Sequence, residues 1–171
     1  MPGRPRLGRG GLNLLGLTAI LLAIAVAASV AIPAWFNQPS VTLDNAARLL
    51  AQDLRELQNR AAYNFQSLEM HFDAGGDGYA CFDQDGEPLR APAGKGAYRR
   101  TYSRDAVFRG VRLSRVDAGA QGVVRFDPRG MLAEDARMEL TYGGEVRVVH
   151  LERGAGLLRI DGLSEPWHEL E

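Results

Sequence analysis

Residues 12–32 read LNLLGLTAILLAIAVAASVAI, a run of 21 residues without a charged side chain. As an α-helix rising about 1.5 Å per residue, this run extends roughly 31 Å, which is enough to cross the hydrocarbon core of a bilayer. Arg4, Arg6 and Arg9 precede the run, and the next charged residue after it is Asp44. Because basic residues favour the cytoplasmic side, the sequence predicts one transmembrane helix with residues 1–11 in the cytoplasm and the rest exported.

Two other interpretations of this N-terminus stay open on the residues alone. A secretory signal peptide also has basic residues before an apolar core, but its core is usually about 7–15 residues long. The run in this chain is longer, and no clear small-x-small cleavage site follows it. An ordinary uncleaved anchor has the same length and charge pattern, so it remains an alternative.

The segment that follows predicts a bend and then an amphipathic helix. Pro33 and Pro39 each lack a backbone donor and restrict the preceding residue, so the helix leaving the membrane should be interrupted there. Residues 41–62 place apolar side chains three and four residues apart, which predicts one buried helical face, with Thr42 as a candidate N-cap. This apolar stripe consists of Leu43, Ala47, Leu50, Leu54, Leu57 and Ala61. We expect it to pack on the chain's own sheet, with a partner helix as the alternative.

After Gln66 the apolar period changes from helical spacing to two, which predicts strands. Gly143-Gly144 separates two alternating segments and suits the two-residue turn of a hairpin. The strands are expected within residues 67–73, 79–82, 107–116, 123–126, 136–142, 145–151 and 156–160, with a turn at 117–121. A long helix followed by a mostly antiparallel sheet is an α+β fold. The predicted parts are a basic leader (1–11), a transmembrane helix (12–32), a bend and amphipathic helix (33–65) and a β-rich domain (66–171).

Spacing at the N-terminus resembles a known family. Gly11 directly precedes the apolar run, and Pro33 is the twenty-second residue counted from Leu12. This arrangement is similar to type IV pilins and pseudopilins, in which a prepilin peptidase cuts after a glycine and the new first residue is methylated. The resemblance implies that Gly11 ends the leader, that Leu12 is the methylated mature N-terminus and that Pro33 bends the helix.

The chain departs from the family pattern at two positions. The family usually has Phe first and Glu fifth, where this chain has Leu12 and Gly16. The family glutamate is thought to pair with the terminal amine of a neighbouring subunit, because an unpaired charge in lipid is costly. Its absence resembles exceptional subunits at a filament tip, and it also fits a degenerate paralogue that is cut poorly or not at all.

The second half resembles the H-type minor pseudopilins of type II secretion and their fimbrial relatives, the GspH/FimT family. The residues that carry the resemblance are Phe126-Asp127-Pro128-Arg129-Gly130, similar to an F-x-P-x-G element, and the final strand at 156–160, GLLRI. The resemblance implies an inner-membrane subunit with a periplasmic domain and no cofactor. Its partners would be other pseudopilins or minor pilins, a prepilin peptidase and a secreted cargo. The rival functions are a fimbrial minor pilin that binds DNA or a surface, and an envelope domain that is never processed.

Charge argues against broad binding of nucleic acid. The chain has 20 Lys and Arg residues against 21 Asp and Glu residues, and 17 against 21 without the three leader arginines. Binding to DNA requires clustered positive charge that displaces counterions, so DNA is not the expected partner. Arginines of the second half could line one sheet edge, but interleaved Asp and Glu residues favour a mixed, solvated surface. These arginines are Arg125, Arg129, Arg137, Arg147, Arg153 and Arg159.

One acidic stretch is a weak candidate for calcium. Asp83, Asp85 and Glu87 lie in a predicted loop, and calcium prefers such oxygen ligands. An EF-hand needs a longer ordered series with a closing Glu, of which this stretch is only a fragment. Solvated turn residues are therefore the preferred interpretation.

No catalytic motif appears in the sequence. His71, His150 and His168 are far apart and belong to no metalloprotease, hydrolase or phosphate-binding pattern. Cys81 cannot form a disulfide within the chain, and we expect it to be a small, half-buried strand residue. The sequence therefore predicts a structural protein and not an enzyme.

Overall fold

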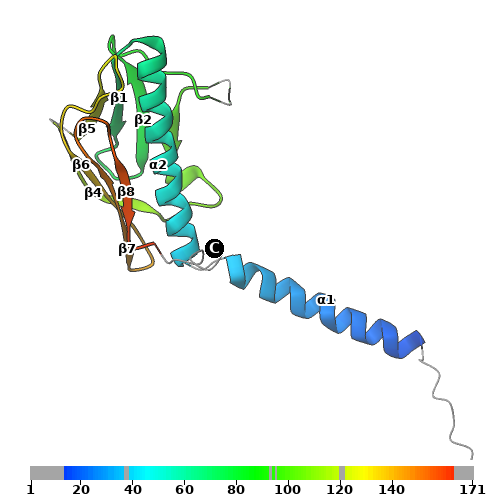
Figure 1. Ribbon diagram of the computed structural model, residues 1–171. Helices are drawn as coiled ribbons and strands as arrows, with labels where there is room; N and C mark the ends of the chain where they lie inside the picture. The colour runs from blue at the N-terminus through cyan, green and yellow to red at the C-terminus, as the bar shows by residue number, and fades with distance from the viewer. Residues whose placement is uncertain (1–13, 37–38, 93, 95, 120–121, 164–171) are drawn as a thin grey trace, which may run out of the picture. The chain divides into compact units, whose positions relative to one another are not determined.

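The computed structural model describes residues 14–36, 39–92, 94, 96–119 and 122–163 of the chain. These residues belong to two compact units, Met1–Gln38 and Pro39–Glu171. The first unit contains helix α1 (Leu14–Phe36), and the second contains helix α2 (Pro39–Asn64) and all of the described strands (Figure 1).

Helix α1 overlaps the predicted transmembrane segment and continues past Pro33 to Phe36. The side chains described in α1, those of residues 16–27, are all exposed. In the described part of the chain, no helix combines the length and the apolar character that a bilayer crossing requires. The membrane span at 12–32 therefore stays a prediction. The helix is not interrupted at Pro33, because α1 continues through it to Phe36, and a bend there stays a prediction.

Helix α2 begins at Pro39, three residues before the predicted N-cap. Proline fits the first helical position because its missing N–H would have no partner there in any case. The prediction that Thr42 caps the helix is therefore wrong, and Thr42 is instead a buried residue inside α2. At the other end, Phe65 takes a positive φ of 53° and the Gln66 N–H donates to the Ala61 carbonyl at 3.1 Å. This bond is the six-to-one closure of a Schellman motif.

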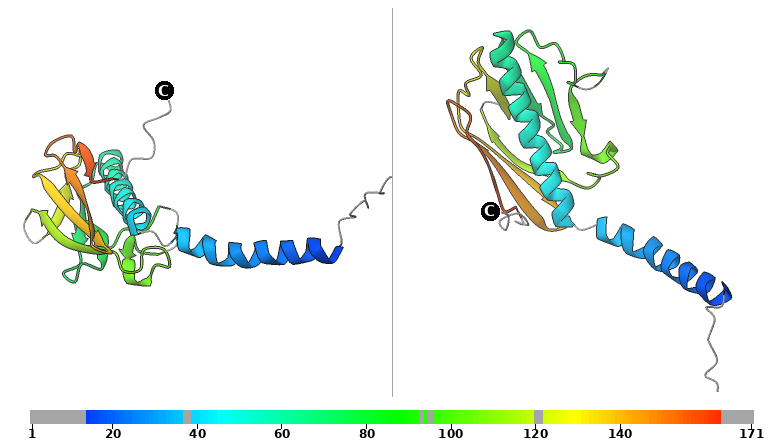
Figure 2. Two further views of the ribbon diagram at one scale, coloured as in Figure 1. Left: turned by 90° about the horizontal axis from the view of Figure 1, so that it is seen from below. Right: turned by 45° about the vertical axis from the view of Figure 1, so that its right-hand side comes forward.

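Within the described residues, eight strands form two four-stranded sheets in which every neighbouring pair is antiparallel. The first sheet has the order β3-β2-β1-β5 and the second the order β4-β6-β7-β8. Figures 1 and 2 show α2, in cyan, lying against both sheets. The first sheet contains β1 (Leu68–Phe72), β2 (Gly78–Asp83), β3 (Arg99–Thr101) and β5 (Val123–Phe126). The second contains β4 (Arg112–Ala118), β6 (Ala136–Tyr142), β7 (Glu145–Leu151) and β8 (Leu158–Asp161).

The predicted apolar stripe of α2 is confirmed. Its six residues are completely buried, and together with the inward-facing residues of both sheets they form one core. The β6–β7 hairpin is also confirmed, with Tyr142 opposite Glu145 on the two sides of the Gly-Gly turn. The helix thus packs its buried face against both sheets.

The strand predicted at 107–116 and the turn predicted at 117–121 are wrong in part. β4 starts only at Arg112 and continues to Ala118, so Asp117 lies in a strand. Residues 105–110 turn instead, because Asp105 Oδ1 accepts hydrogen bonds from the Val107 N–H at 2.8 Å and the Phe108 N–H at 3.3 Å. The three-residue strand β3 and the one-turn 3-10 helix η1 (Tyr102–Arg104) were not predicted.

Candidate functional site

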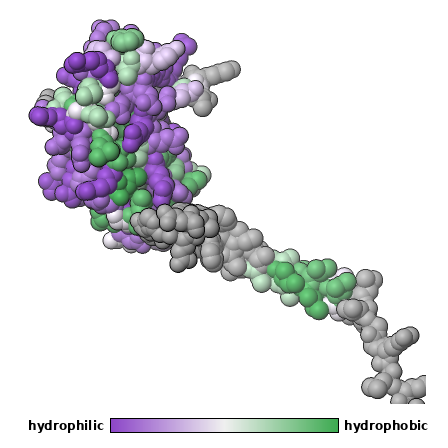
Figure 3. Space-filling model, viewed as in Figure 1, coloured by the Kyte–Doolittle hydropathy of each residue, from purple (hydrophilic) through white to green (hydrophobic). Residues whose placement is uncertain are grey.

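Of the N-terminal positions singled out by the resemblance, the structure describes Gly16 and Pro33 but not Gly11 and Leu12. Gly11 and Leu12 lie outside the described residues, so cleavage and methylation there stay predictions. Gly16 lies in α1, and a Cβ added to it would meet no other atom within 4 Å. Leu17–Val26 exposes large apolar side chains, which are green in Figure 3. Exposed apolar surface of this kind is typical of a segment that makes contacts with other apolar groups.

Three polar contacts, called the polar anchors of α2, hold this helix to the rest of its domain. The first is the ion pair between Asp44 of α2 and Arg147 of β7. The Arg147 Nε donates to Asp44 Oδ1 at 2.5 Å, and its Nη2 donates to Glu145 Oε2 at 3.0 Å. Arg147 is 6% exposed and Asp44 is 8% exposed, whereas the Glu145 side chain is 41% exposed. Removing one member of a buried pair leaves the other charge uncompensated, so this contact fixes the start of α2 on its sheet. Arg147 is therefore not a surface residue available for binding DNA.

The second anchor joins α2 to the first sheet through Asp53. Its Oδ2 accepts hydrogen bonds from the Tyr79 hydroxyl at 2.7 Å and from Arg100 Nε at 2.9 Å. Burial, with the nearby Tyr102 and Asp53, raises the pKa of Tyr79 well above its ordinary value, so the hydroxyl stays protonated as a donor. The contacts of Asp44 and Asp53 were not predicted from the sequence. The available signal was their place beside the apolar stripe, where a charged residue requires a partner.

The third anchor explains the F-x-P-x-G element. Asp127 Oδ1 accepts hydrogen bonds from the Arg129 N–H at 2.8 Å and the Met131 N–H at 2.9 Å, which closes the turn. Gln58 Nε2 then donates to the Gly130 carbonyl at 2.9 Å and to the Ala155 carbonyl at 2.8 Å. A Cβ on Gly130 would lie 3.0 Å from a backbone oxygen of α2. The element therefore works as a close-packed contact between its turn and α2.

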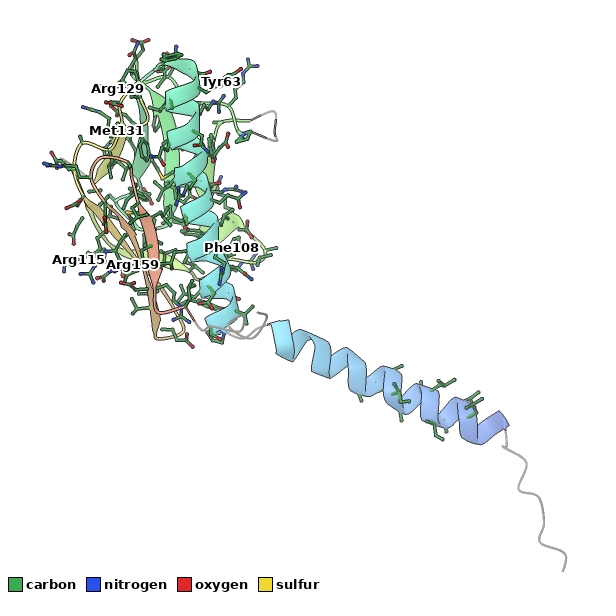
Figure 4. The ribbon with its side chains drawn as sticks, viewed as in Figure 1. Tyr63, Phe108, Arg115, Arg129, Met131 and Arg159 are labelled. Atoms are coloured by element: carbon green, nitrogen blue, oxygen red, sulfur yellow. The ribbon has the colours of Figure 1, made fainter. Side chains whose placement is uncertain are left out.

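Most of the second-half arginines are paired with carboxylates and do not form a cationic cluster. Figure 4 shows the labelled Arg115 and Arg159 on the sheet side of the domain, and each pairs with an aspartate two residues along its own strand. The pairs are Arg125–Glu69, Arg129–Asp127, Arg137–Glu139 and Arg159–Asp161, while Arg153 is exposed. The mixed, solvated surface predicted from the sequence is confirmed for these five arginines, whereas the sixth, Arg147, is buried.

The acidic loop folds into a turn. Asp83 Oδ1 accepts hydrogen bonds from the Asp85 N–H at 3.0 Å and the Glu87 N–H at 2.9 Å. Over the residues that the structure describes, no three His, Cys, Asp or Glu side chains are grouped to hold a metal ion. The calcium interpretation therefore gains no support.

The two described histidines, His71 and His150, lie on different sheets and pair with different carboxylates. His71 Nε2 lies 2.6 Å from Glu69 on the first sheet, and His150 Nε2 lies 3.1 Å from Asp161 on the second. His168 lies outside the described residues. Cys81 is completely buried, more so than predicted, and burial raises the pKa of its thiol to about 12. A thiol with that pKa is not a nucleophile at neutral pH.

Comparison with solved structures identifies the fold. The minor pseudopilin EpsH from the type 2 secretion system of Vibrio cholerae superimposes with a TM-score of 0.55 at 17% identity, covering 72% of this chain and 98% of EpsH. Two crystal structures of the Pseudomonas aeruginosa type IV minor pilin FimU give TM-scores of 0.49 and 0.48, each at 14% identity, with 90% and 95% of FimU covered. No family model and no curated protein sequence matches this chain. The likeness to EpsH confirms the predicted α+β, pilin-like fold.

Proposed function

We propose that this chain is a minor pseudopilin-like subunit of a type II secretion or type IV pilus-like assembly. The observation that carries the proposal is the fold shared with EpsH, which extends over 98% of that minor pseudopilin. The apolar, uncharged α1 supports an assembly role, because a subunit of this kind needs a segment that can leave lipid and pack among other apolar helices. The proposed role is structural and includes no catalytic step.

In this proposal the two parts of the chain have different tasks. The segment at 12–32 holds the subunit in the inner membrane, with residues 1–11 in the cytoplasm and the domain from 66 to 171 in the periplasm. Prepilin peptidase removes the leader after Gly11, and Leu12 becomes the methylated N-terminus. The domain then contacts other minor subunits or a secreted cargo protein.

Gly16 bears on the position of the subunit in the assembly. A glycine supplies no carboxylate to pair with the terminal amine of a neighbouring subunit. A subunit at the tip of a filament has no neighbour above it and does not need that pair, so Gly16 supports a tip position. If the chain is instead a degenerate paralogue that is not cut, its N-terminus should remain at Met1. The N-terminus therefore distinguishes a processed tip subunit from an uncut paralogue.

The test is the mass of the N-terminus of the protein recovered from membranes of a host that carries a prepilin peptidase. We expect a methylated start at Leu12, and an uncut Met1 in a Gly11→Val control. An uncut Met1 in the wild-type protein would leave only an anchored envelope domain and refute the proposed processing.

A DNA-binding minor pilin is the alternative function. It requires accessible cations, whereas Arg147 is buried and Arg125, Arg129, Arg137 and Arg159 are paired with carboxylates. Salt-sensitive binding that falls in an Arg159→Ala variant would favour this alternative over a purely structural subunit.

A further inference from the structure

The exposed face of α2 carries arginine and amide side chains but no exposed carboxylate. Among the described residues, the exposed positions from 42 to 62 in α2 follow one another at helical spacing: Asn45, Arg48, Gln52, Arg55 and Asn59. The acidic residues of the helix are Asp44, Asp53 and Glu56. The first two are buried against Arg147 and Arg100, and the third is half-buried.

A groove lies along this face. It has a volume of about 580 Å³, and its lining includes Arg55 and Asn59 from α2 and Tyr98, Arg99 and Arg100 from the opposite side. Figures 1 and 2 show the green segment that joins β2 to β3 beside α2, and the Arg60 Nη1 ties the two together by donating to the Arg90 carbonyl at 2.7 Å. The groove therefore lies between α2 and the β2–β3 connection, and the Arg60–Arg90 hydrogen bond joins these two sides.

The guanidinium groups of this groove differ from those of the sheet faces. Arg100 is paired with Asp53, but among the described residues no carboxylate forms an ion pair with the other two arginines of the groove, Arg55 and Arg99. The opposite wall is formed by residues between Ala91 and Arg100. In the sequence, residues 88–100 hold four Lys and Arg residues and no Asp or Glu residue. This excess occurs in a chain whose total net charge is −1. The positive charge is therefore concentrated beside α2.

We propose that the groove between α2 and the β2–β3 connection binds an acidic segment of a neighbouring subunit, with its carboxylates on Arg55 and Arg99. Guanidinium groups bind carboxylates through paired, charge-assisted hydrogen bonds, and Gln52 and Asn59 supply further donors beside them. The inference rests on the proposed function, because it names the chemistry of the partner that an assembled subunit would contact.

A peptide fits the groove better than a nucleic acid does. The α2 residues that line the groove, from Gln52 to Asn59, cover about 11 Å of helix at 1.5 Å per residue, the length of one short segment. The half-buried Glu56 also lines the groove, and it would repel a continuous phosphate backbone while leaving room for spaced carboxylates. The chain as a whole carries no positive net charge, whereas DNA binding is driven by clustered positive charge that releases counterions.

The test uses full-length protein in detergent and a fluorescein-labelled helical peptide with a glutamate at every third or fourth position. The comparison ligands are the same peptide with glutamine in place of glutamate, and a single-stranded oligonucleotide. Fluorescence anisotropy should show that the wild-type protein binds the glutamate peptide about tenfold more tightly than the glutamine peptide, with affinity that falls as salt is raised.

Arg55→Glu/Arg99→Glu is the informative variant, since both side chains are exposed and neither holds the fold together. It should lose about tenfold in affinity for the glutamate peptide, while the matched Arg153→Glu control, exposed and outside the groove, stays within about twofold of wild type. Equal binding of the two peptides, an equal loss in Arg153→Glu, or tighter binding of the oligonucleotide would each overturn the proposal. N-terminal processing is measured on the same samples. If the variant is still cut after Gly11 but no longer binds the glutamate peptide, the two proposals are tested separately. The proposed function fails only if the cut after Gly11 is absent.

Discussion

Arg147 allows a direct comparison of two ion pairs made by one guanidinium. Asp44 and Glu145 both accept from it, at 2.5 and 3.0 Å, but Asp44 is buried and Glu145 is exposed to water on one side. Breaking a buried pair costs about 3–5 kcal/mol, because a desolvated charge is left behind, whereas an exposed pair contributes about 0.2–1 kcal/mol. Since Glu145 remains to hold Arg147 after Asp44 is removed, we expect Asp44→Ala to cost about 3 kcal/mol and Glu145→Ala about 0.5 kcal/mol.

The assay is urea unfolding of the full-length protein in detergent, monitored by circular dichroism. The free energies of unfolding are compared between variants whose slope m against urea concentration is the same as that of the wild type. An Asp44→Leu/Arg147→Met double variant completes the comparison, because replacing a buried pair with apolar residues of similar volume is often neutral or stabilising. Equal costs for Asp44→Ala and Glu145→Ala would refute the reasoning, since they would mean that the buried and the exposed carboxylates are equally solvated.

Three further predictions concern other parts of the domain. Gly130→Ala should cost at least about 1 kcal/mol more than Gly86→Ala in the same unfolding assay, because both residues have positive φ but only Gly130 has α2 backbone 3.0 Å from an added Cβ. Hydrogen bonds from Ser103 lower the pKa of Asp77 below its ordinary value of 3.8. The contribution of Asp77 to stability is therefore present above pH 3.8 and is lost as the pH falls through the lowered pKa. The Asp77→Asn variant should lose less stability in acid than the wild-type protein does. Cys81 should not react with a maleimide in the folded protein and should react fully in urea, and rapid native labelling would contradict its burial.

The parts of the fold that were predicted depend on local patterns. The stripe of α2 follows from helical spacing, and the β6–β7 hairpin follows from alternation on both sides of Gly143-Gly144. The division into two sheets has no local signal, because β1 is completed by β5, more than fifty residues along the chain. β3 has only three residues, too few for a period of two to be recognised.

The site could be predicted only in part for the same reason. Arg147 shares its face of β7 with Val149 and Leu151, a position that a charged residue occupies only if a partner is brought to it. That partner, Asp44, lies 103 residues away in sequence. Similarly, Arg99 follows Tyr98 in a basic stretch whose place beside α2 depends on the path of the whole β2–β3 connection. No local pattern in the sequence indicated this groove.

The three polar anchors of α2 also determine how the domain would respond to mechanical load. Asp44, Asp53 and Gln58 lie along about 21 Å of helix and hold it to β7, to β2 and β3, and to the turns at Gly130 and Ala155. A pull directed along the helix axis strains all three contacts simultaneously, so the force on each is only a share of the total. A pull directed sideways at Pro39 strains the Asp44 contact first and the others only after it has failed. The domain should therefore resist axial tension more strongly than peeling.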